Sequence, residues 1–332
     1  MFNRYLLTGA SGFLGRAVLE ELKRRDAQIS ILVMDNDLVP FDASHDVDIV
    51  HGDVCRDSTL KRFFRGADEN TCVIHCAGIV SVASNPGDRI YKVNVGGTNN
   101  IIRNCEKSGV GKLVYVSSVH ALPQNGGISE ITEPYVFSPD LVSGDYAKSK
   151  AIATSLVFEA SARGLNASVV FPSGIIGPGD IGKGSMTSML LAYLKGKLPM
   201  AVKGGYDFVD VRDVASGIVS CADCAQSGHG YVLSGHYATI REVLRAAKET
   251  IGKSRVVTFI PLCLAKLVAP AFERRSLRKR QRPYFTPYAI SVLGSGCQFS
   301  SASAADAFGY DPRPISSSIR DTVLWLKDVM VK

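Results

Sequence analysis

The sequence predicts an α/β fold in which a doubly wound parallel sheet is followed by a smaller, discontinuous C-terminal lobe. Strand-like apolar runs alternate with helical stretches over residues 1–172, which is the pattern of parallel βαβ units. A glycine-rich turn joins the first strand to the first helix, as in Rossmann-type sheets that bind dinucleotides. Beyond residue 172 the periodicity loosens. We therefore expect a dinucleotide-binding Rossmann domain at 1–172, to which 205–235 return, and a substrate-binding lobe made of 173–204 and 236–332.

The first strand, 4–7, runs into the turn Thr8-Gly9-Ala10-Ser11-Gly12-Phe13-Leu14-Gly15. Apolar residues then recur every four positions, which predicts a helix. Glycines let the backbone approach a ligand, and the free N–H groups at the start of the helix point at a pyrophosphate. We therefore expect cofactor contacts from Gly9, Ser11, Gly12, Phe13, Leu14 and Gly15.

The second strand, 29–34, ends in Asp35, twenty residues after Gly15. This is the offset expected of an acid that holds the ribose hydroxyls of the adenosine. A carboxylate there repels a 2′-phosphate, and Met34, Asn36 and Asp37 offer no arginine to receive one. The sequence therefore predicts NAD(H) rather than NADP(H). NADP remains the alternative, and Arg16 is the residue that would favour it.

The later strands are expected to bring further cofactor-binding residues to the same edge of the sheet. Ligands of doubly wound sheets sit at the carboxyl ends of the strands. Strands at 48–54, 72–78, 112–116 and 167–171 end in small, acidic or hydroxyl side chains, or in proline. The cofactor contacts expected from these ends are Asp53, Val54, Ala77, Gly78, Ser117 and Pro172. Ser118 follows Ser117 at the fifth strand, and a helix over 91–106 carries Asn94.

Tyr146 and Lys150 lie four residues apart in a stretch, 144–163, that we expect to be helical. That spacing places both side chains on one face, one turn apart. A tyrosine pKa near 10 must fall by about three units before the hydroxyl can act as an acid/base at neutral pH. One nearby cation shifts a neighbour by about 1–3 units, so Lys150 alone is marginal. An oxidised nicotinamide ring would supply the second positive charge, and both residues are also expected to contact the cofactor.

The second half of the chain shows weaker signals. We expect a helix at 186–195, and a short strand at 207–213 that turns into a helix ending at Cys224. Further helices are expected from a cap at Thr239 to Ile251 and at 316–330, with one more strand at 231–233. The apolar stretch 256–272 is expected to pack as core under the substrate lobe.

The net charge of +7 is mostly local, because six cations lie within 274–282. The remainder of the chain is close to neutral, which excludes a globally basic nucleic-acid binder. We expect the basic run to lie beside the substrate cleft, to be mobile without ligand, and to bind anionic membranes weakly. A solvated surface or a docking surface for an anion are the alternatives.

The sequence shows no signal peptide and no apolar stretch of about 20 residues that could span a membrane. Scattered cysteines, several within apolar runs, suit reduced thiols in a cytoplasmic protein. The pair Cys221-x-x-Cys224 has no second pair beside it, and the six histidines show no ligand spacing, so we expect no metal.

Taken together, these motifs resemble the extended short-chain dehydrogenase/reductase family, also described as the NAD-dependent epimerase/dehydratase family. The motifs occur in family order and reach residue 235: Thr8-Gly9-x-x-Gly12-Phe13-Leu14-Gly15, Gly52-Asp53-Val54, Asn94-Val95-x-Gly97-Thr98, Ser117-Ser118, Tyr146-x-x-Ser149-Lys150, Phe171-Pro172 and Phe208-Val209-Asp210-Val211-x-Asp213-Val214-Ala215. The tail, from Pro283-x-Phe285-Thr286-Pro287-Tyr288 to Phe308-Gly309-Tyr310-x-Pro312, is similar to the dihydroflavonol-reductase and 3β-hydroxysteroid-dehydrogenase branch.

The resemblance implies a role for each catalytic candidate. Tyr146 would be the acid/base, Lys150 would hold the nicotinamide ribose and lower the tyrosine pKa, and Ser118 would hydrogen-bond the substrate oxygen. Asn94 would help to relay protons, although a buried asparagine that satisfies backbone groups is an equal interpretation. His120 is expected beside the pocket rather than in the reaction.

Three functions follow from this constellation. The first is an oxidoreductase that interconverts an alcohol and a ketone or aldehyde by hydride transfer with NAD. The second is a nucleotide-sugar epimerase that retains its NAD. The third is a non-catalytic dinucleotide sensor, which the presence of both Tyr146 and Lys150 disfavours. No acid occurs between Ser118 and Glu130, which argues against a dehydratase. The expected partner is a small-molecule substrate, with a homodimer as an option.

Overall fold

The computed structural model describes residues 1–37, 47–83, 86–123, 130–134, 136–252, 256–278 and 285–330. Its centre is a parallel sheet of seven strands in the order β10-β6-β5-β4-β1-β2-β3, which is the predicted doubly wound arrangement. The strands of this sheet are β1 (Arg4–Thr8), β2 (Gln28–Val33), β3 (Val47–His51), β4 (Thr71–His75), β5 (Lys112–Val116), β6 (Ala167–Pro172) and β10 (Gly230–Leu233).

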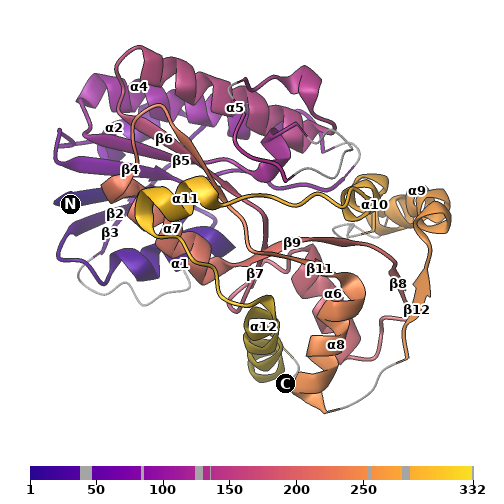
Figure 1. Cartoon of the computed structure of the whole chain (residues 1–332). Coiled ribbons are helices and arrows are strands. Elements are labelled where there is room, and N and C mark those ends of the chain that lie inside the picture. Colours follow the sequence, from indigo (N-terminus) through magenta and orange to yellow (C-terminus); the bar gives the residue numbers. More distant parts are fainter. Residues whose placement is uncertain are drawn as a thin grey trace.

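Helices cover both faces of this sheet, as parallel strands with two apolar faces require. Figure 1 shows α2 (Asp57–Phe63), α4 (Thr98–Ser108) and α5 (Asp145–Ala162) together on one side. On the other face lie α1 (Phe13–Leu22), α7 (Val211–Cys224) and α11 (Ala302–Phe308). Alternate residues of β1 point to the two cores: Leu6 packs with the first set of helices, and Tyr5 and Leu7 pack with the second.

The second lobe contains two small sheets. In one, β9 (Gly205–Asp210) pairs with β7 (Gly174–Ile176) and β11 (His236–Thr239), and in the other β8 (Met200–Val202) pairs with β12 (Thr258–Ile260). The predicted cap Thr239 begins α8 (Ile240–Ile251) through a capping box with Glu242. The remaining helices are α6 (Ser185–Leu194), α9 (Leu262–Arg278), α10 (Pro287–Gly294) and α12 (Ile315–Met330).

The single helix predicted over 91–106 is wrong in its first half. The structure has a short α3 (Arg89–Tyr91), a π-helical turn over Lys92–Gly97, and then α4. The turn passes close to the loop after β3, because a Cβ atom on Gly97 would lie 2.8 Å from Cγ2 of Val54. Asn94 lies in this turn, and its amide nitrogen donates a 3.0 Å hydrogen bond to the hydroxyl of Ser149 on α5.

The expectation that 256–272 forms core is also wrong for most of that stretch. Within α9 only Ala265 and Ala269 are buried apolar residues, whereas Leu267 is 77% exposed. The helical period brings the small residues inward and leaves the large ones outside. Within the described residues, none of the helices has the length and apolar character needed to cross a membrane. The basic run begins near the end of α9, with Arg274 followed by Arg275 and Arg278 in the last turn, and its residues 279–282 lie outside the described residues.

Candidate active site

The glycine-rich turn lies between β1 and α1 and is packed too tightly for side chains. Gly9 has φ +77°, and a Cβ atom there would lie 2.7 Å from the amide nitrogen of Ala77 at the end of β4. A Cβ atom on Gly15 would lie 2.0 Å from the carbonyl oxygen of Gly9. No side chain caps α1 at Gly12, so its first N–H groups stay available to an anion. This arrangement fits the pyrophosphate of a dinucleotide, with Phe13 and Leu14 in the first turn of the helix.

Two acids follow β2, and the structure separates them. The hydroxyl of Ser11 donates a 2.6 Å hydrogen bond to Asp37, whereas the side chain of Asp35 is 88% exposed and lies 3.4 Å from Nδ1 of His51. Sequence reasoning chose Asp35 by its offset from Gly15 and treated Asp37 only as a neighbour, and no sequence signal indicated the contact of Asp37 with Ser11. The buried Nε atom of Arg16 in α1 has no hydrogen-bond partner, which also fits an anionic cofactor at this turn.

The ends of β3 and β4 approach the same region. Asp53 turns into its own loop, where Oδ1 accepts a 2.9 Å hydrogen bond from the amide of Cys55. Val54 is buried. Ala77 donates its amide proton to the hydroxyl of Thr8, 3.2 Å away. A Cβ atom on Gly78 would lie 3.2 Å from Oδ1 of Asn94 and 3.4 Å from Nζ of Lys150, so a larger residue would crowd these two side chains.

Asn94 links the loop after β4 to helix α5. Its Oδ1 accepts a 2.7 Å hydrogen bond from the amide of Ile79, and its Nδ2 donates to the carbonyl of Ile79 and to the hydroxyl of Ser149, each at 3.0 Å. The Ser149 hydroxyl in turn donates to the carbonyl of Tyr146 at 2.8 Å. Both ends of the buried amide are therefore engaged.

A buried histidine that sequence reasoning did not single out braces the sheet beneath the glycine turn. Nδ1 of His75 lies 2.7 Å from the hydroxyl of Thr8, and Nε2 lies 3.1 Å from the hydroxyl of Thr98. Burial lowers the pKa of His75 to about 3. The neutral ring therefore links β1, β4 and α4.

Lys150 lies buried on α5 against the end of β5. Its Nζ donates a 2.8 Å hydrogen bond to the carbonyl of Val116 and lies 4.9 Å from the centre of the Tyr115 ring. Burial lowers the pKa of Lys150 to about 8, because the apolar surroundings disfavour the ammonium. The amine is therefore still mostly protonated at neutral pH and close to its titration point.

Tyr146 lies one turn before Lys150 and is also buried. Burial raises the pKa of Tyr146, and a hydrogen bond with Ser118 acts in the opposite direction. The surrounding side chains therefore do not by themselves produce the lowered pKa that an acid/base needs. Ser118 accepts a 3.2 Å hydrogen bond from the amide of His120, whereas the hydroxyl of Ser117 points into α5 and lies 2.7 Å from that of Thr154. Pro172, at the end of β6, is buried.

His120 is the residue whose position the sequence underestimated. Its ring centre lies 5.6 Å from that of Tyr146, and it stacks on Tyr206 at 5.8 Å. Nδ1 of His120 is 2.9 Å from the hydroxyl of Tyr288, and Nε2 is 3.5 Å from that of Tyr206. Burial lowers the pKa of His120 to about 4, so the ring is neutral at physiological pH. Tyr206 gave no sequence signal, and Tyr288 appeared only within the tail motif with no role in the site, because both reach the site from the second lobe.

A cavity of about 220 Å³ opens beside this histidine between α6, β8 and α10. Its walls are almost entirely apolar: Val82, Met186, Met189, Leu198, Met200, Ala201, Val202, Phe208, Ile240, Phe285, Ala289, Ile290, Val292 and Leu293 line it, with His120, Tyr206, Tyr288, Ser185 and Gly174 as the other members. His120, Tyr206 and Tyr288 bring their polar groups together beside Tyr146. An apolar cavity with a few convergent polar groups is the usual plan of a small-molecule site.

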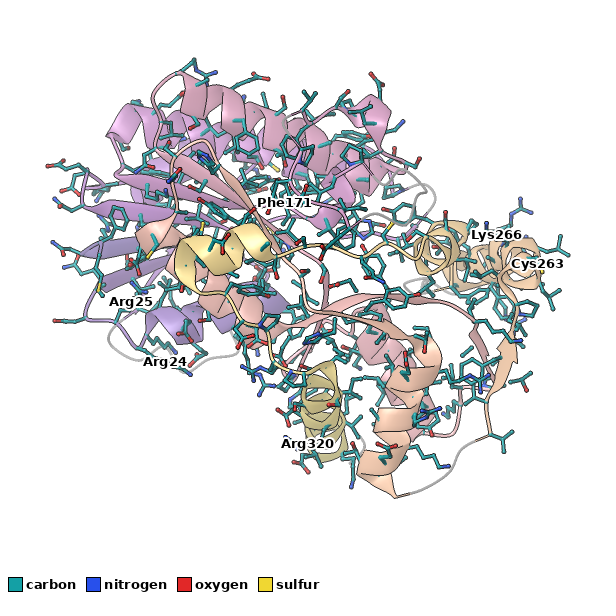
Figure 2. All side chains as sticks on the ribbon, in the orientation of Figure 1. Arg24, Arg25, Phe171, Cys263, Lys266 and Arg320 are labelled. Carbon is teal, nitrogen blue, oxygen red and sulfur yellow. The ribbon has the colours of Figure 1, made fainter. Side chains whose placement is uncertain are left out.

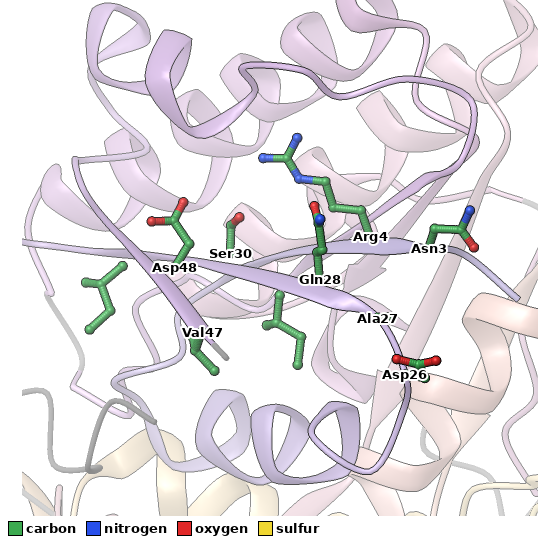
Figure 3. A pocket seen from close by; sticks show the side chains of 10 residues that line it. Asn3, Arg4, Asp26, Ala27, Gln28, Ser30, Val47 and Asp48 are labelled. Atoms are coloured by element: carbon green, nitrogen blue, oxygen red, sulfur yellow. The ribbon is translucent and has the colours of Figure 1, made fainter. Parts of the chain in front are cut away.

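A second hollow, of about 940 Å³, lies at the opposite edge of the central sheet (Figure 3). Arg4, Gln28 and Asp48 line it, and they lie in the amino-terminal halves of β1, β2 and β3. Ligands of doubly wound sheets bind at the carboxyl ends of the strands, so this hollow has no part in the site. The pair Cys221 and Cys224 lies on α7 with both thiols free, and no cluster of three metal ligands occurs in the described part of the chain.

Residues 5–234 match the family model described as the NAD dependent epimerase/dehydratase family. The chain is similar to sterol demethylase protein B of Methylococcus capsulatus, with 27% identity over 97% of this chain and 98% of that protein. It is also similar to a putative dihydroflavonol 4-reductase of Synechocystis, with 25% identity over 99% and 96% of the two chains.

Among solved structures, the crystal structure of gox2253 superposes with a TM-score of 0.84 and 27% identity, and the match covers 98% of each chain. The family match spans more than half of the sequence and includes the glycine turn, Tyr146 and Lys150. The chain belongs to the NAD dependent epimerase/dehydratase family and is an enzyme of the extended short-chain dehydrogenase/reductase type.

Proposed function

We propose that this enzyme interconverts a secondary alcohol and its ketone on an apolar substrate, with NAD as the hydride carrier and Tyr146, Ser118 and Lys150 as the working side chains. The observation that carries the proposal is the apolar cavity that ends on His120, whose ring packs against Tyr146. A substrate in this cavity would present its oxygen to the one polar end, beside the acid/base.

Tyr146 would give a proton to the ketone oxygen in one direction and take it from the alcohol in the other. A positioned acid/base of this kind typically contributes about 10²–10⁴-fold to the rate. Ser118, which hydrogen-bonds Tyr146, would fix the phenol and the substrate oxygen in one place. His120, held between Tyr206 and Tyr288, would form the wall against which the substrate carbonyl is set.

Lys150 would bind the hydroxyls of the nicotinamide ribose and add positive charge beside Tyr146. When bound, NAD supplies the hydride acceptor and a positive ring in the oxidised state. Burial raises the pKa of Tyr146 in the chain alone, so both charges are needed to bring it toward neutrality. The backbone of the glycine turn and the start of α1 would hold the pyrophosphate, and Ser11 with Asp37 or Asp35 the adenosine ribose.

The character of the cavity distinguishes the substrate classes. The described residues that line it include no lysine or arginine, so the diphosphate of a nucleotide sugar would find no cation there. Its apolar walls suit a fused ring system, and the similarity to sterol demethylase protein B supports a sterol-like skeleton. The volume lies below the roughly 300–1,000 Å³ of common ligand pockets, so a large skeleton would be only partly enclosed.

Absorbance at 340 nm tests the proposal. The enzyme with NAD would be given hydroxysteroids and cyclic secondary alcohols in one series, and nucleotide sugars in another. We expect NADH to accumulate with apolar alcohols only. Conversion of a nucleotide sugar to its epimer without net absorbance change, measured by chromatography, would replace this proposal with an epimerase that retains its cofactor.

We also propose that the chain divides functionally near residue 172. In support, α7 packs on α1 and β10 pairs with β6, so both would belong with the dinucleotide-binding part. Strand β9 pairs with β7 and β11 instead, which moves 205–210 toward the substrate lobe. The substrate lobe would then comprise 173–210 and 236–332 except for α11, which packs on α7 and β10 of the dinucleotide-binding part.

A further inference from the structure

Helix α9 exposes large apolar side chains at one end of the molecule. Leu267 is 77% exposed and Leu264 is 45% exposed, while Ala265 and Ala269 on the inner side are fully buried. Figure 2 shows Cys263 and Lys266 projecting from this helix, away from the body of the protein. Contiguous exposed apolar groups rimmed by polar ones mark interaction surfaces.

The outer face of α9 changes character along its length. Leu264, Leu267, Ala271, Arg274 and Arg278 recur at intervals of three or four, so they form one stripe. The first three positions are apolar and the last two are cationic, and all five are exposed. Arg275 and Lys266, also exposed, flank the stripe.

The inner face of the same helix backs the substrate cavity. Ala265 and Ala269 pack in one cluster with Val202 and Ile290, and both of these residues also line the cavity. A single layer of side chains therefore lies between α9 and the cavity. Whatever covers the outer face of α9 comes close to the place where an apolar substrate would sit.

We propose that α9 docks on the surface of an anionic membrane. The leucines of its first half would enter the boundary between headgroups and acyl chains, and the arginines of its second half would meet the lipid phosphates. Each basic residue near such a surface contributes about a fivefold gain in affinity. Docking would bring the cavity wall to the lipid from which a sterol-like substrate is drawn, and only this last consequence rests on the proposed function.

The polarity of the stripe disfavours a second copy of the chain as its occupant. Two α9 helices paired in parallel would place arginines against arginines. Paired in the antiparallel sense, they would bury Arg274 and Arg278 of each copy against the leucines of the other, which costs desolvation without a partner charge. An anionic bilayer, with apolar and charged layers side by side, complements both halves.

Co-sedimentation of the full chain with vesicles tests this docking. Vesicles of phosphatidylcholine alone would be compared with vesicles that also contain phosphatidylserine, at low and physiological salt. We expect at least tenfold tighter binding to the anionic vesicles. The double variants Leu264→Ser/Leu267→Ser and Arg274→Gln/Arg278→Gln should each lose about tenfold or more. The matched control is Leu324→Ser/Arg320→Gln on α12, which changes the same residue types on another exposed face and should bind as wild type does.

Circular dichroism and oxidation of a water-soluble cyclic alcohol show whether each variant is folded and active. The proposal is overturned if wild type stays in the supernatant with anionic vesicles at low salt, or if the α9 variants bind as the control does. It is also overturned if the α9 variants convert a dimer to a monomer on size exclusion, since α9 would then be a contact between copies. Loss of docking with activity retained removes only this inference, whereas docking without any dehydrogenase activity removes only the proposed reaction.

Discussion

The Nδ1 atom of His120 lies 2.9 Å from the hydroxyl oxygen of Tyr288, which joins the edge of the central sheet to a helix 168 residues later in the chain. The ring of Tyr288 also packs against Gly144, the residue that precedes α5. The substrate lobe is thus fastened to the site at two points, and the position of Tyr288 affects both the histidine and the helix of Tyr146.

Replacing Tyr146 with phenylalanine should remove the proton transfer and leave the fold intact. We expect kcat to fall by about 10²–10⁴-fold, with NADH binding within about threefold of wild type. Steady-state kinetics and a fluorescence titration of NADH measure the two effects. Tyr237→Phe, at an exposed tyrosine of β11, is the control and should change neither. An active Tyr146→Phe enzyme, within about threefold of wild type, would show that another group moves the proton.

Replacing Asn94 with alanine should destabilise the protein, because the amide of Ile79 and the hydroxyl of Ser149 would lose buried partners. An unsatisfied buried group costs about 1–3 kcal/mol. Urea unfolding should show a loss of that size, against a change within about 0.5 kcal/mol for Asn99→Ala on the exposed side of α4. Equal stabilities of the two variants would mean that the hydrogen bonds of Asn94 to Ile79 and Ser149 contribute nothing to folding stability.

NADH should bind more tightly than NADPH, because the carboxylates of Asp35 and Asp37 repel a 2′-phosphate. Titration of both reduced cofactors by fluorescence measures the preference. Asp37→Asn should reduce the preference for NADH over NADPH. It should also lower the affinity for NADH, since the contact with Ser11 is altered. Asp48→Asn, at the distal hollow, should leave both affinities unchanged. Tighter binding of NADPH to wild type would give Arg16 the decisive role instead.

Acid should destabilise the protein partly through His120. Folding lowers its pKa from 6.5 to about 4, so the unfolded chain takes up the proton first. Its contribution to stability is therefore complete above about pH 6.5 and is lost as the pH falls toward 4, by up to about 1.4 kcal/mol per pH unit. Tyr146, Tyr206 and Tyr288 face the ring, and burial raises the pKa of each, so none titrates in this window.

The variant His120→Gln isolates the contribution of His120 to the pH dependence of stability. Urea unfolding of wild type and variant at pH 7, 6 and 5 should show a shallower decline for the variant. His75, whose pKa is also lowered by burial, is present in both proteins and cancels in the comparison. Parallel declines would show that the imidazole of His120 is not kept neutral by the fold.

Gly144→Ala should cost more than backbone strain alone. Gly144 has φ +90°, and a Cβ atom there would lie 2.7 Å from Cε2 of Tyr288. Gly164 has φ +111° with no atom within 4 Å of its Cβ position, so Gly164→Ala is a control for strain without a clash. We expect both variants to lose stability, and only Gly144→Ala to raise KM, because Tyr288 must move. Matching KM values would show that Tyr288 yields without disturbing the cavity.

Local patterns predicted the part of the site that the chain forms from neighbouring residues. The glycine turn between β1 and α1, and the Tyr146–Lys150 spacing on α5, are set by periods of a few residues. The contact between His120 and Tyr288 is not, because it depends on how α10 packs 168 positions later in the chain. The offset from Gly15 favoured Asp35, whereas the contact of Asp37 with Ser11 depends on the direction that the chain takes after β2.

Contacts between distant parts of the chain also explain why the predictions for 256–272 and 91–106 were wrong. Apolar content placed α9 in the core, yet exposure depends on which face meets Val202 and Ile290, and alanines fill that face. Likewise, the sequence predicted one helix over 91–106 where the structure has a π-helical turn, and the close approach of Val54 to Gly97 in that turn involves a different part of the chain.

The pairing of β10 with β6 has a consequence for synthesis on the ribosome. Until residue 233 has emerged, β6 is an open edge of the nascent sheet, although Val169, Val170 and Phe171 are all fully buried in the finished protein. Translation at about 5–20 residues per second leaves this edge unpaired for roughly 3–12 s while 173–229 are made. Open apolar edges pair with other chains. A fragment that stops at residue 172 should therefore aggregate, and the nascent chain should engage chaperones over the same interval.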